Sequence, residues 1–291
     1  MFRLLFGALL GALLLPFAAS GGTSTLPAPG TVLGGGYQPA NLSSPGLTML
    51  ALSVVDAKHV AVWVAPFVSG CAGQPVVFHA ALAADGSFKG VYRNGYDKAS
   101  GAYADGGGPV TYAGRFASPT KATGTIRLVW AEGANDCRTD TISWAASTKS
   151  SSSSGAAAPS ALYTGTTSQK SKLAPVNLPL MVRVSADGKT AAATAYLNTF
   201  CADAPALNIS SGGFFAGPGM KIGADSSFHE LGRFYATVGT RKVAYTSTFT
   251  GRFGAGAVSG TWTMDALVTA KATGKKIASC TSGSLTWRAV R

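Results

Sequence analysis

Hydrophobic and polar residues alternate with a period of two along most of the chain, which is typical of strands rather than helices. Ile126 and Trp130 are expected on one face of a strand and Val129 on the other, while Trp262 and Met264 share a face in a similar run. Gly and Asp turn signals separate these short runs, and no amphipathic helix is predicted after the N-terminal segment. The pattern indicates an all-β protein built of antiparallel β-sandwiches or flattened barrels.

Aromatic residues follow the same period and mark the faces that we expect to be buried. Tyr112 and Phe116 share parity in the first half of the chain. Tyr245, Phe249 and Phe253 share parity in the second half. Residues of equal parity on a strand point to the same side of the sheet, so each group predicts a core-facing row.

The first twenty residues carry a different pattern. Arg3 is followed by an unbroken apolar run over 4–15 and then by small residues up to Ser20. This is typical of a secretory signal peptide, residues 1–20, cleaved after Ser20. A retained N-terminal anchor is the alternative, although the run is shorter than the roughly 20 residues that span a bilayer. No later segment is long and apolar enough to cross a membrane, so we expect a secreted, periplasmic or cell-surface protein with no transmembrane segment in the mature chain.

The chain contains an internal duplication. Cys137, six residues and Trp144 recur as Cys280, six residues and Trp287. Other landmarks occur twice in the same order, and the pairs are 54–58 with 184–189, 71 with 201, 85–88 with 225–228, 114–116 with 251–253, and 124–125 with 260–261. Chance similarity rarely keeps so many landmarks in order, so we interpret the chain as a tandem repeat.

Four cysteines in an exported chain predict two disulfides, and their number alone allows three pairings. The duplication favours one pairing, in which each repeat contains its own bond. The predicted bonds are Cys71 to Cys137 and Cys201 to Cys280.

The predicted domain organisation follows from the repeat and from two segments poor in large apolar residues. Residues 21–30 form an N-terminal spacer and residues 148–159 a Ser/Ala-rich linker, which we expect to be flexible. The two homologous β-sandwich or flattened-barrel domains then span residues 31–147 and 160–291.

Composition and charge narrow the classes of function. Only 12% of residues are charged and 46% are hydrophobic, which excludes a disordered polyampholyte and a charge-rich coiled coil. The net charge is +12, and residues 156–291 contribute fourteen basic and five acidic residues, or +9. A basic face outside the cell predicts salt-dependent contact with an anionic envelope polymer or glycan. The candidate anion-binding residues are Arg241, Lys242, Lys271, Lys275 and Lys276.

The basic residues have two other interpretations. Lysines also keep an Ala- and Gly-rich protein soluble without binding anything. A nucleic acid is not the expected partner, because aromatic residues do not alternate with the lysines as they do on single-strand platforms.

An insertion over 89–108 has no counterpart in the second repeat. Aromatic rings flanked by polar groups are what a glycan-binding loop uses. The candidates are Tyr92, Arg93, Asn94, Tyr96, Asp97, Tyr103 and Asp105. Two alternatives stay open: a Ca²⁺ site at Asp97 and Asp105, or a Gly-rich hairpin whose tyrosines cover the edge of the domain.

The sequence predicts no catalytic residue, cofactor or metal. The chain lacks a nucleophile elbow, a metalloprotease motif, a P-loop and a dinucleotide-binding fingerprint. It has three histidines: His59, His79 and His229. His229 and Glu230 form the most reactive-looking dipeptide, but neighbours on a strand point to opposite faces.

These observations favour a secreted binding or structural protein that contacts cell-envelope polymers or extracellular glycans over an enzyme. The alternative is a secreted hydrolase with its site in the Tyr92–Asp105 insertion or between the domains. A subunit or inhibitor that binds another exported protein through an uncovered sheet edge is a third hypothesis.

Overall fold

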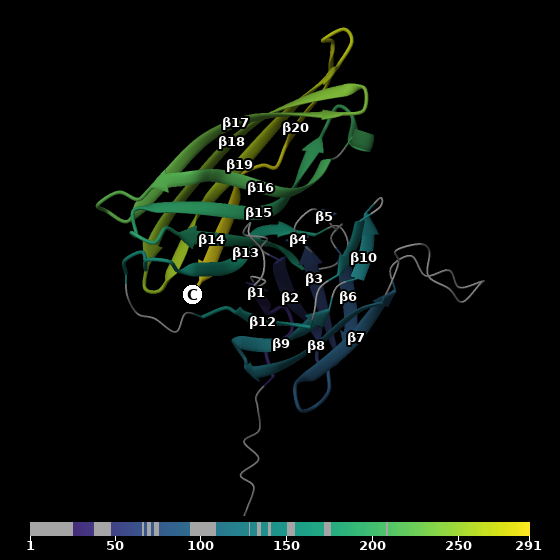
Figure 1. Ribbon diagram of the computed structural model, residues 1–291, viewed down its shortest axis with the longest axis vertical. Helices are drawn as coiled ribbons and strands as arrows, with labels where there is room; N and C mark the ends of the chain where they lie inside the picture. The colour runs from purple at the N-terminus through teal and green to yellow at the C-terminus, as the bar shows by residue number, and fades with distance from the viewer. Residues whose placement is uncertain are drawn as a thin grey trace, which may run out of the picture.

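The computed structural model of the chain describes an all-β, antiparallel protein (Figure 1). Apart from one 3₁₀ turn, η1 (Pro205–Leu207), every regular element in the described residues is a strand. No helix in that part of the chain could span a membrane. The described residues are 26–37, 48–65, 67–68, 71–72, 76–93, 109–127, 129–132, 135–138, 141–149, 155–171, 176–207 and 209–291.

The first half of the chain forms an eight-stranded barrel-like sheet, here called the first sheet. Its strands pair in the order β6, β3, β2, β1, β12, β9, β8, β7, so chain neighbours are also sheet neighbours and the first strand pairs with the last. A single bridge between Leu82 and Phe88 links the ends of the path. The strands are β1 (Val32–Tyr37), β2 (Thr48–Asp56), β3 (His59–Ala65), β6 (Val76–Ala81), β7 (Ser87–Arg93), β8 (Pro109–Ser118), β9 (Lys121–Arg127) and β12 (Ile142–Ser147).

Two short ribbons accompany this sheet. They consist of β4 (Phe67–Val68) with β5 (Cys71–Ala72), and of β10 (Val129–Glu132) with β11 (Asn135–Arg138).

The second half forms the second sheet, whose main path has the order β16, β15, β14, β13, β21, β19, β18, β17. The connectivity is the same as in the first sheet, with the first and last strands of the half again paired. One more strand, β20, pairs with both β15 and β19. The strands are β13 (Leu162–Lys170), β14 (Asn177–Val184), β15 (Thr190–Cys201), β16 (Ile209–Lys221), β17 (Ser227–Val238), β18 (Arg241–Gly254), β19 (Ala257–Ala270), β20 (Lys276–Thr281) and β21 (Leu285–Val290).

The aromatic rows predicted from the alternation fill the interiors. In the second sheet, Phe249 stacks on Trp287 with ring centroids 4.9 Å apart and meets the edge of Trp262 at 5.5 Å. Tyr245 and Phe253 are buried in the same core, as predicted. The core of the first sheet is built in the same way and contains Tyr112, Phe116 and Trp144.

One run that the alternation predicted as a single strand is divided. Ile126 is buried in the core of the first sheet, whereas Val129 is buried outside that cluster, with 7% of its surface exposed. Strand β9 ends at Arg127 and β10 begins at Val129. Period-two parity holds only while the backbone stays extended, so it does not carry across this division.

The two sheets pack against each other through a third hydrophobic cluster on their outer faces. Trp63 on β3 meets Tyr196 on β15 with ring centroids 4.7 Å apart. Strands β1 and β13 approach so closely that a Cβ on Gly34 would overlap the backbone of Gly165. The Thr164 hydroxyl donates to the Gly34 carbonyl at 3.3 Å. The other cluster members are Met49, Ala51, Ala61, Val176, Leu178 and Met181.

The turns before β7 and β17 are built alike. Asp85 Oδ1 accepts hydrogen bonds from the backbone N–H and the hydroxyl of Ser87, and Asp225 Oδ1 does the same with Ser227. Nε of Arg115 donates to the Asp85 carbonyl at 3.2 Å, and Nε of Arg252 to the Asp225 carbonyl at 3.3 Å. In both turns, the Ser hydrogen bonds are the main reason that the pKa of the Asp carboxyl is lowered.

The predicted Cys201–Cys280 disulfide is present and links β15 to β20. The side chains of Cys71 and Cys137 lie outside the described part of the chain, so their pairing stays a prediction. Ala157 and Ala158, which fall in the predicted linker, pack against the core of the second sheet.

Candidate functional site

The five predicted anion-binding residues gather at one end of the second sheet. Strands β17 and β18 form one hairpin there, and β19 and β20 form the next. The backbone N–H of Lys271 donates to the Thr240 carbonyl at 2.8 Å, so the two turns touch. We call this end the basic tip; its residues are Arg241, Lys242, Lys271, Lys275 and Lys276, all of them exposed.

Glycines let both chain reversals form. Gly239 and Gly274 have φ of 57° and 69°, in the left-handed region that favours glycine. In the second turn, the N–H groups of Ala270 and Gly274 donate to the carbonyls of Lys275 and Ala270, each at 2.8 Å. These two hydrogen bonds close the turn that joins β19 to β20.

Little negative charge offsets the basic tip. Lys276 Nζ lies 3.8 Å from Asp203 Oδ2, and Asp203 also accepts a hydrogen bond from the Ser279 N–H. Within the described residues, none of the other four tip side chains forms an ion pair. Four cations are therefore available to an external anion.

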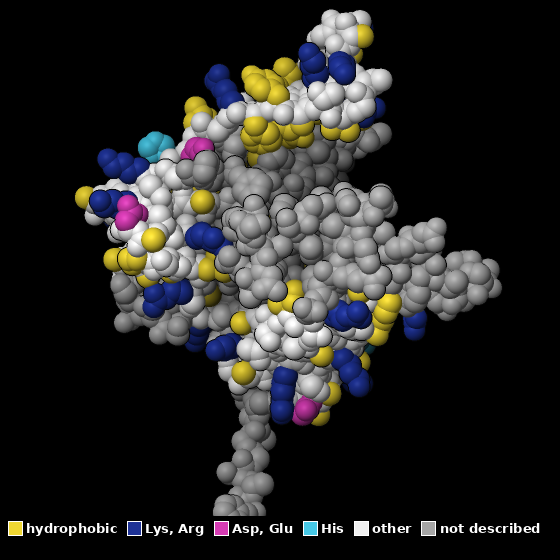
Figure 2. All heavy atoms as spheres, viewed as in Figure 1, with side chains coloured by type: hydrophobic (Ala, Val, Ile, Leu, Met, Phe, Trp, Pro, Cys, Tyr) yellow, Lys and Arg dark blue, Asp and Glu magenta, His cyan; other side chains and the backbone are white. Residues whose placement is uncertain are grey.

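Exposed apolar side chains lie on the strands that lead to these cations, a feature that the sequence analysis missed. Figure 2 shows hydrophobic side chains between lysines and arginines over the upper part of the second sheet. Tyr235 is 79% exposed, Leu231 63% and Val238 62%, all on β17. Leu267 on β19 is 43% exposed, and Ile277 on β20 is 37% exposed. Alternation alone identifies two faces of a strand but not which face is covered.

A shallow hollow of about 390 Å³ lies on the outer face of β18, β19 and β20. Leu267 lines it and sits in one cross-strand row with Tyr235 and Ala244. The remaining lining is mostly small and hydroxyl-bearing: Ala244, Thr246, Asp265, Ala266, Ser279, Cys280 and Thr281. This hollow extends the exposed surface behind the basic tip.

The predicted glycan loop is only partly described. Tyr92 is 37% exposed and contacts Phe78 edge to face, with ring centroids 5.8 Å apart. Arg93 ends β7 and is exposed. The other candidates, Asn94, Tyr96, Asp97, Tyr103 and Asp105, lie outside the described residues, so the glycan and Ca²⁺ hypotheses stay predictions.

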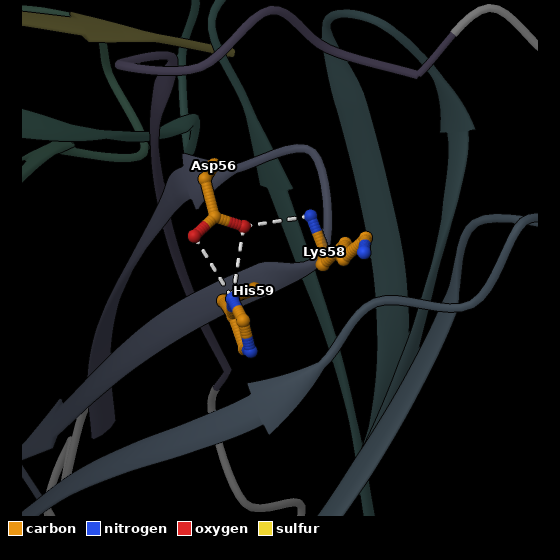
Figure 3. A network of polar contacts seen from close by, with 3 residues as sticks. All are labelled: Asp56, Lys58 and His59. Atoms are coloured by element: carbon orange, nitrogen blue, oxygen red, sulfur yellow. Dashed lines mark hydrogen bonds and ion pairs between the residues drawn. The ribbon is translucent and has the colours of Figure 1, made fainter.

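Figure 3 shows the contact between His59 and a carboxylate, in the turn between β2 and β3. Nδ1 of His59 lies 2.9 Å from both carboxylate oxygens of Asp56, and the Lys58 N–H donates to Asp56 Oδ1 at 2.7 Å. The His59 hydrogen bond, followed by that of Lys58, lowers the pKa of Asp56. Both side chains are more than half exposed, and no described serine, threonine or cysteine side chain hydrogen-bonds to His59. The geometry is that of a turn cap.

His229 and Glu230 lie on opposite faces of β17, as predicted. His229 is exposed and pairs with Thr250. Glu230 pairs with Phe249, so its side chain projects to the core side. Oε2 of Glu230 is buried without a hydrogen-bond partner in the described structure, and the resulting desolvation raises the pKa of this carboxyl. The described residues contain no cluster of His, Cys, Asp and Glu suited to a metal.

Replacing this carboxyl by an amide should change the pH dependence of stability. Because the pKa of Glu230 is higher in the folded state, its stabilising effect is present at low pH and is lost as pH rises from about 4.5 through the folded-state pKa. Glu230→Gln should therefore raise the free energy of unfolding at pH 7, by under about 1 kcal/mol because the side chain is partly exposed. Urea unfolding of both proteins at pH 4 and pH 7 measures this difference. A variant less stable than the wild type at pH 7 would contradict it.

No protein-family model, curated protein or solved structure matches the chain. The clustered cations of the basic tip lie beside exposed apolar side chains and a shallow hollow. This arrangement is suited to binding an extended anionic partner.

Proposed function

We propose that this is a secreted, non-enzymatic binding protein that holds anionic polymers of the cell envelope at the basic tip. The observation that carries the proposal is the contact between two hairpin turns, which brings five cations together. Among the described residues, Asp203 is the one acid that forms an ion pair with them. Clustered cations attract polyanions and release their counterions on binding. The Cys201–Cys280 disulfide supports a location outside the cytoplasm.

The use of the acidic side chains favours binding over hydrolysis. Asp56, Asp85, Asp187 and Asp225 each accept a backbone hydrogen bond from the residue two positions later, which caps a turn. A carboxylate held in this way stabilises the turn by accepting a backbone hydrogen bond. A hydrolase would need a carboxylate or histidine beside a second reactive group in a cleft.

The two halves are proposed to be homologous domains, 31–147 and 160–291. Their shared strand order and the matching turns at Asp85 and Asp225 support this view. On this proposal the duplicated domain provides a common scaffold, and the basic tip is a specialisation of the second copy.

A binding assay with the oxidised protein tests the proposed function. The variant Lys271→Gln/Lys275→Gln removes two cations that form no ion pair, and we expect its affinity for dextran sulfate to fall about tenfold at low salt. The slope of log affinity against log salt should also become shallower, because fewer counterions are released. Surface plasmon resonance on immobilised dextran sulfate, with neutral dextran as the reference, measures both quantities.

The matched control is Lys58→Gln/Lys121→Gln, which removes two exposed cations from the first sheet. This variant has the same net charge as the tip variant. If both variants lose affinity equally, binding follows net charge and the basic tip is not the site. If neither loses affinity, or the wild type does not bind, the proposed function is wrong.

A further inference from the structure

We infer that the basic tip docks onto the surface of an anionic lipid bilayer, with apolar side chains of its two hairpins entering the headgroup region. The inference rests on the proposed function, because the same cations would contact the anionic groups. It goes further by naming the partner, a lipid surface, and by giving the exposed apolar residues a role.

Two of the exposed apolar residues lie close to the turns of the basic tip. Val238 is the last residue of β17 and directly precedes the Gly239 turn. Ile277 is the second residue of β20, next to Lys276. They are 62% and 37% exposed, and they come from the two hairpins that carry the cations.

A second row of apolar residues lies behind the tip on the outer face. Tyr235 pairs with Ala244, which pairs in turn with Leu267. Tyrosine is favoured at the boundary between headgroups and acyl chains, since its ring is apolar and its hydroxyl is polar. The cations, Val238 and Ile277 therefore lie nearest the turns of the hairpins. Tyr235 and Leu267 lie further from the turns.

The combination of charge and apolar surface favours a lipid surface over a soluble polyanion. A hydrated polymer needs only cations, and contact with it removes little apolar area from water. At a bilayer surface, binding strength depends on both the buried apolar area and the attraction of Lys and Arg to anionic headgroups. Exposed apolar side chains of this size, rimmed by polar residues, commonly mark an interaction site.

The structure holds the two hairpins in place before any partner binds. The Lys271 N–H donates to the Thr240 carbonyl, and Arg241 pairs with Ala270 in the ladder between β18 and β19. Strand β20 is fixed on its other side by pairing with β15 and by the disulfide. Little conformational entropy is lost when a preorganised surface docks.

Vesicle co-sedimentation with the full oxidised protein tests the inference. Vesicles of phosphatidylcholine alone are compared with vesicles that also contain phosphatidylglycerol. We expect binding only to the anionic vesicles. The variant Val238→Ser/Ile277→Ser should weaken vesicle binding about tenfold while leaving the affinity for dextran sulfate unchanged.

Matched variants separate the contribution of the apolar side chains to vesicle binding from that of the cations. Val55→Ser/Val91→Ser changes exposed valines of the first sheet, 40% and 53% exposed, and should bind vesicles as the wild type does. Lys271→Gln/Lys275→Gln should weaken both vesicle and dextran sulfate binding, the latter about tenfold as above. Thermal unfolding of every variant shows whether it folds. A substitution V238W adds a direct probe, whose emission should shift to the blue and be quenched by brominated lipid.

The outcomes distinguish the two proposals. If Val238→Ser/Ile277→Ser binds vesicles as tightly as the wild type and V238W is not quenched, the lipid inference is overturned and the tip is a site for soluble polyanions. If the lysine variant keeps both kinds of binding, the proposed function fails as well. If vesicles are not bound but dextran sulfate is, the partner is a polymer and only the lipid inference is lost.

Discussion

Phe249→Ala should lower the free energy of unfolding by about 3–5 kcal/mol, the range measured when a buried phenylalanine is truncated. Phe249 has no exposed surface and lies between Trp262 and Trp287, with ring centroids 5.5 and 4.9 Å away. Two large rings cannot close the resulting cavity without leaving their own contacts. Urea unfolding followed by tryptophan fluorescence measures the change.

A control on the same sheet separates packing from strand propensity. Leu231 is on the neighbouring strand and 63% exposed, so Leu231→Ala should change the free energy of unfolding by no more than about 0.5 kcal/mol. If Phe249→Ala were as mild as this control, Phe249 would not be at the centre of the core.

Removal of the Cys201–Cys280 disulfide should lower the free energy of unfolding by about 4 kcal/mol in the chain-entropy model. The bond joins residues 79 apart in the sequence, so its loss frees a long loop in the unfolded state. The variant Cys201→Ala/Cys280→Ala, unfolded in urea beside the oxidised wild type, measures the effect. A loss below about 1 kcal/mol would show that the unfolded chain is little constrained by this bond.

The first half provides a matched comparison for the disulfide. If Cys71 and Cys137 are bonded as predicted, Cys71→Ala/Cys137→Ala should be destabilising to a similar degree. Peptide mapping of the non-reduced protein identifies the pairing directly. A peptide that joins Cys71 to Cys201 or Cys280 would contradict one bond per repeat.

The sequence by itself predicted the secondary structure class and much of the core. Period-two alternation correctly placed Tyr245, Phe249 and Phe253 on a buried face. The pairing of Cys201 with Cys280, which was predicted from the spacing of matching landmarks, is present. These features depend on local spacing, which the chain carries whatever its tertiary structure. The run that contains Ile126 and Val129 was predicted as one strand, and the pattern did not mark its division into β9 and β10.

The surface, in contrast, was decided by tertiary structure. Arg241 and Lys242 are far from Lys271 in the sequence, and only the contact between the two hairpin turns brings them together. Gly34 and Gly165 lie far apart in the chain, and their close approach depends on how the two sheets pack.

The exposed apolar residues give the clearest contrast. Tyr235 alternates with its neighbours as Phe249 does on the next strand, yet one is 79% exposed and the other 0%. Alternation assigns a residue to a face of a strand, but burial depends on whether another part of the chain covers that face. Local sequence therefore determined the strands, the buried aromatic rows and the Cys201–Cys280 disulfide. Tertiary packing alone decided which apolar and charged side chains form the basic tip and its surroundings.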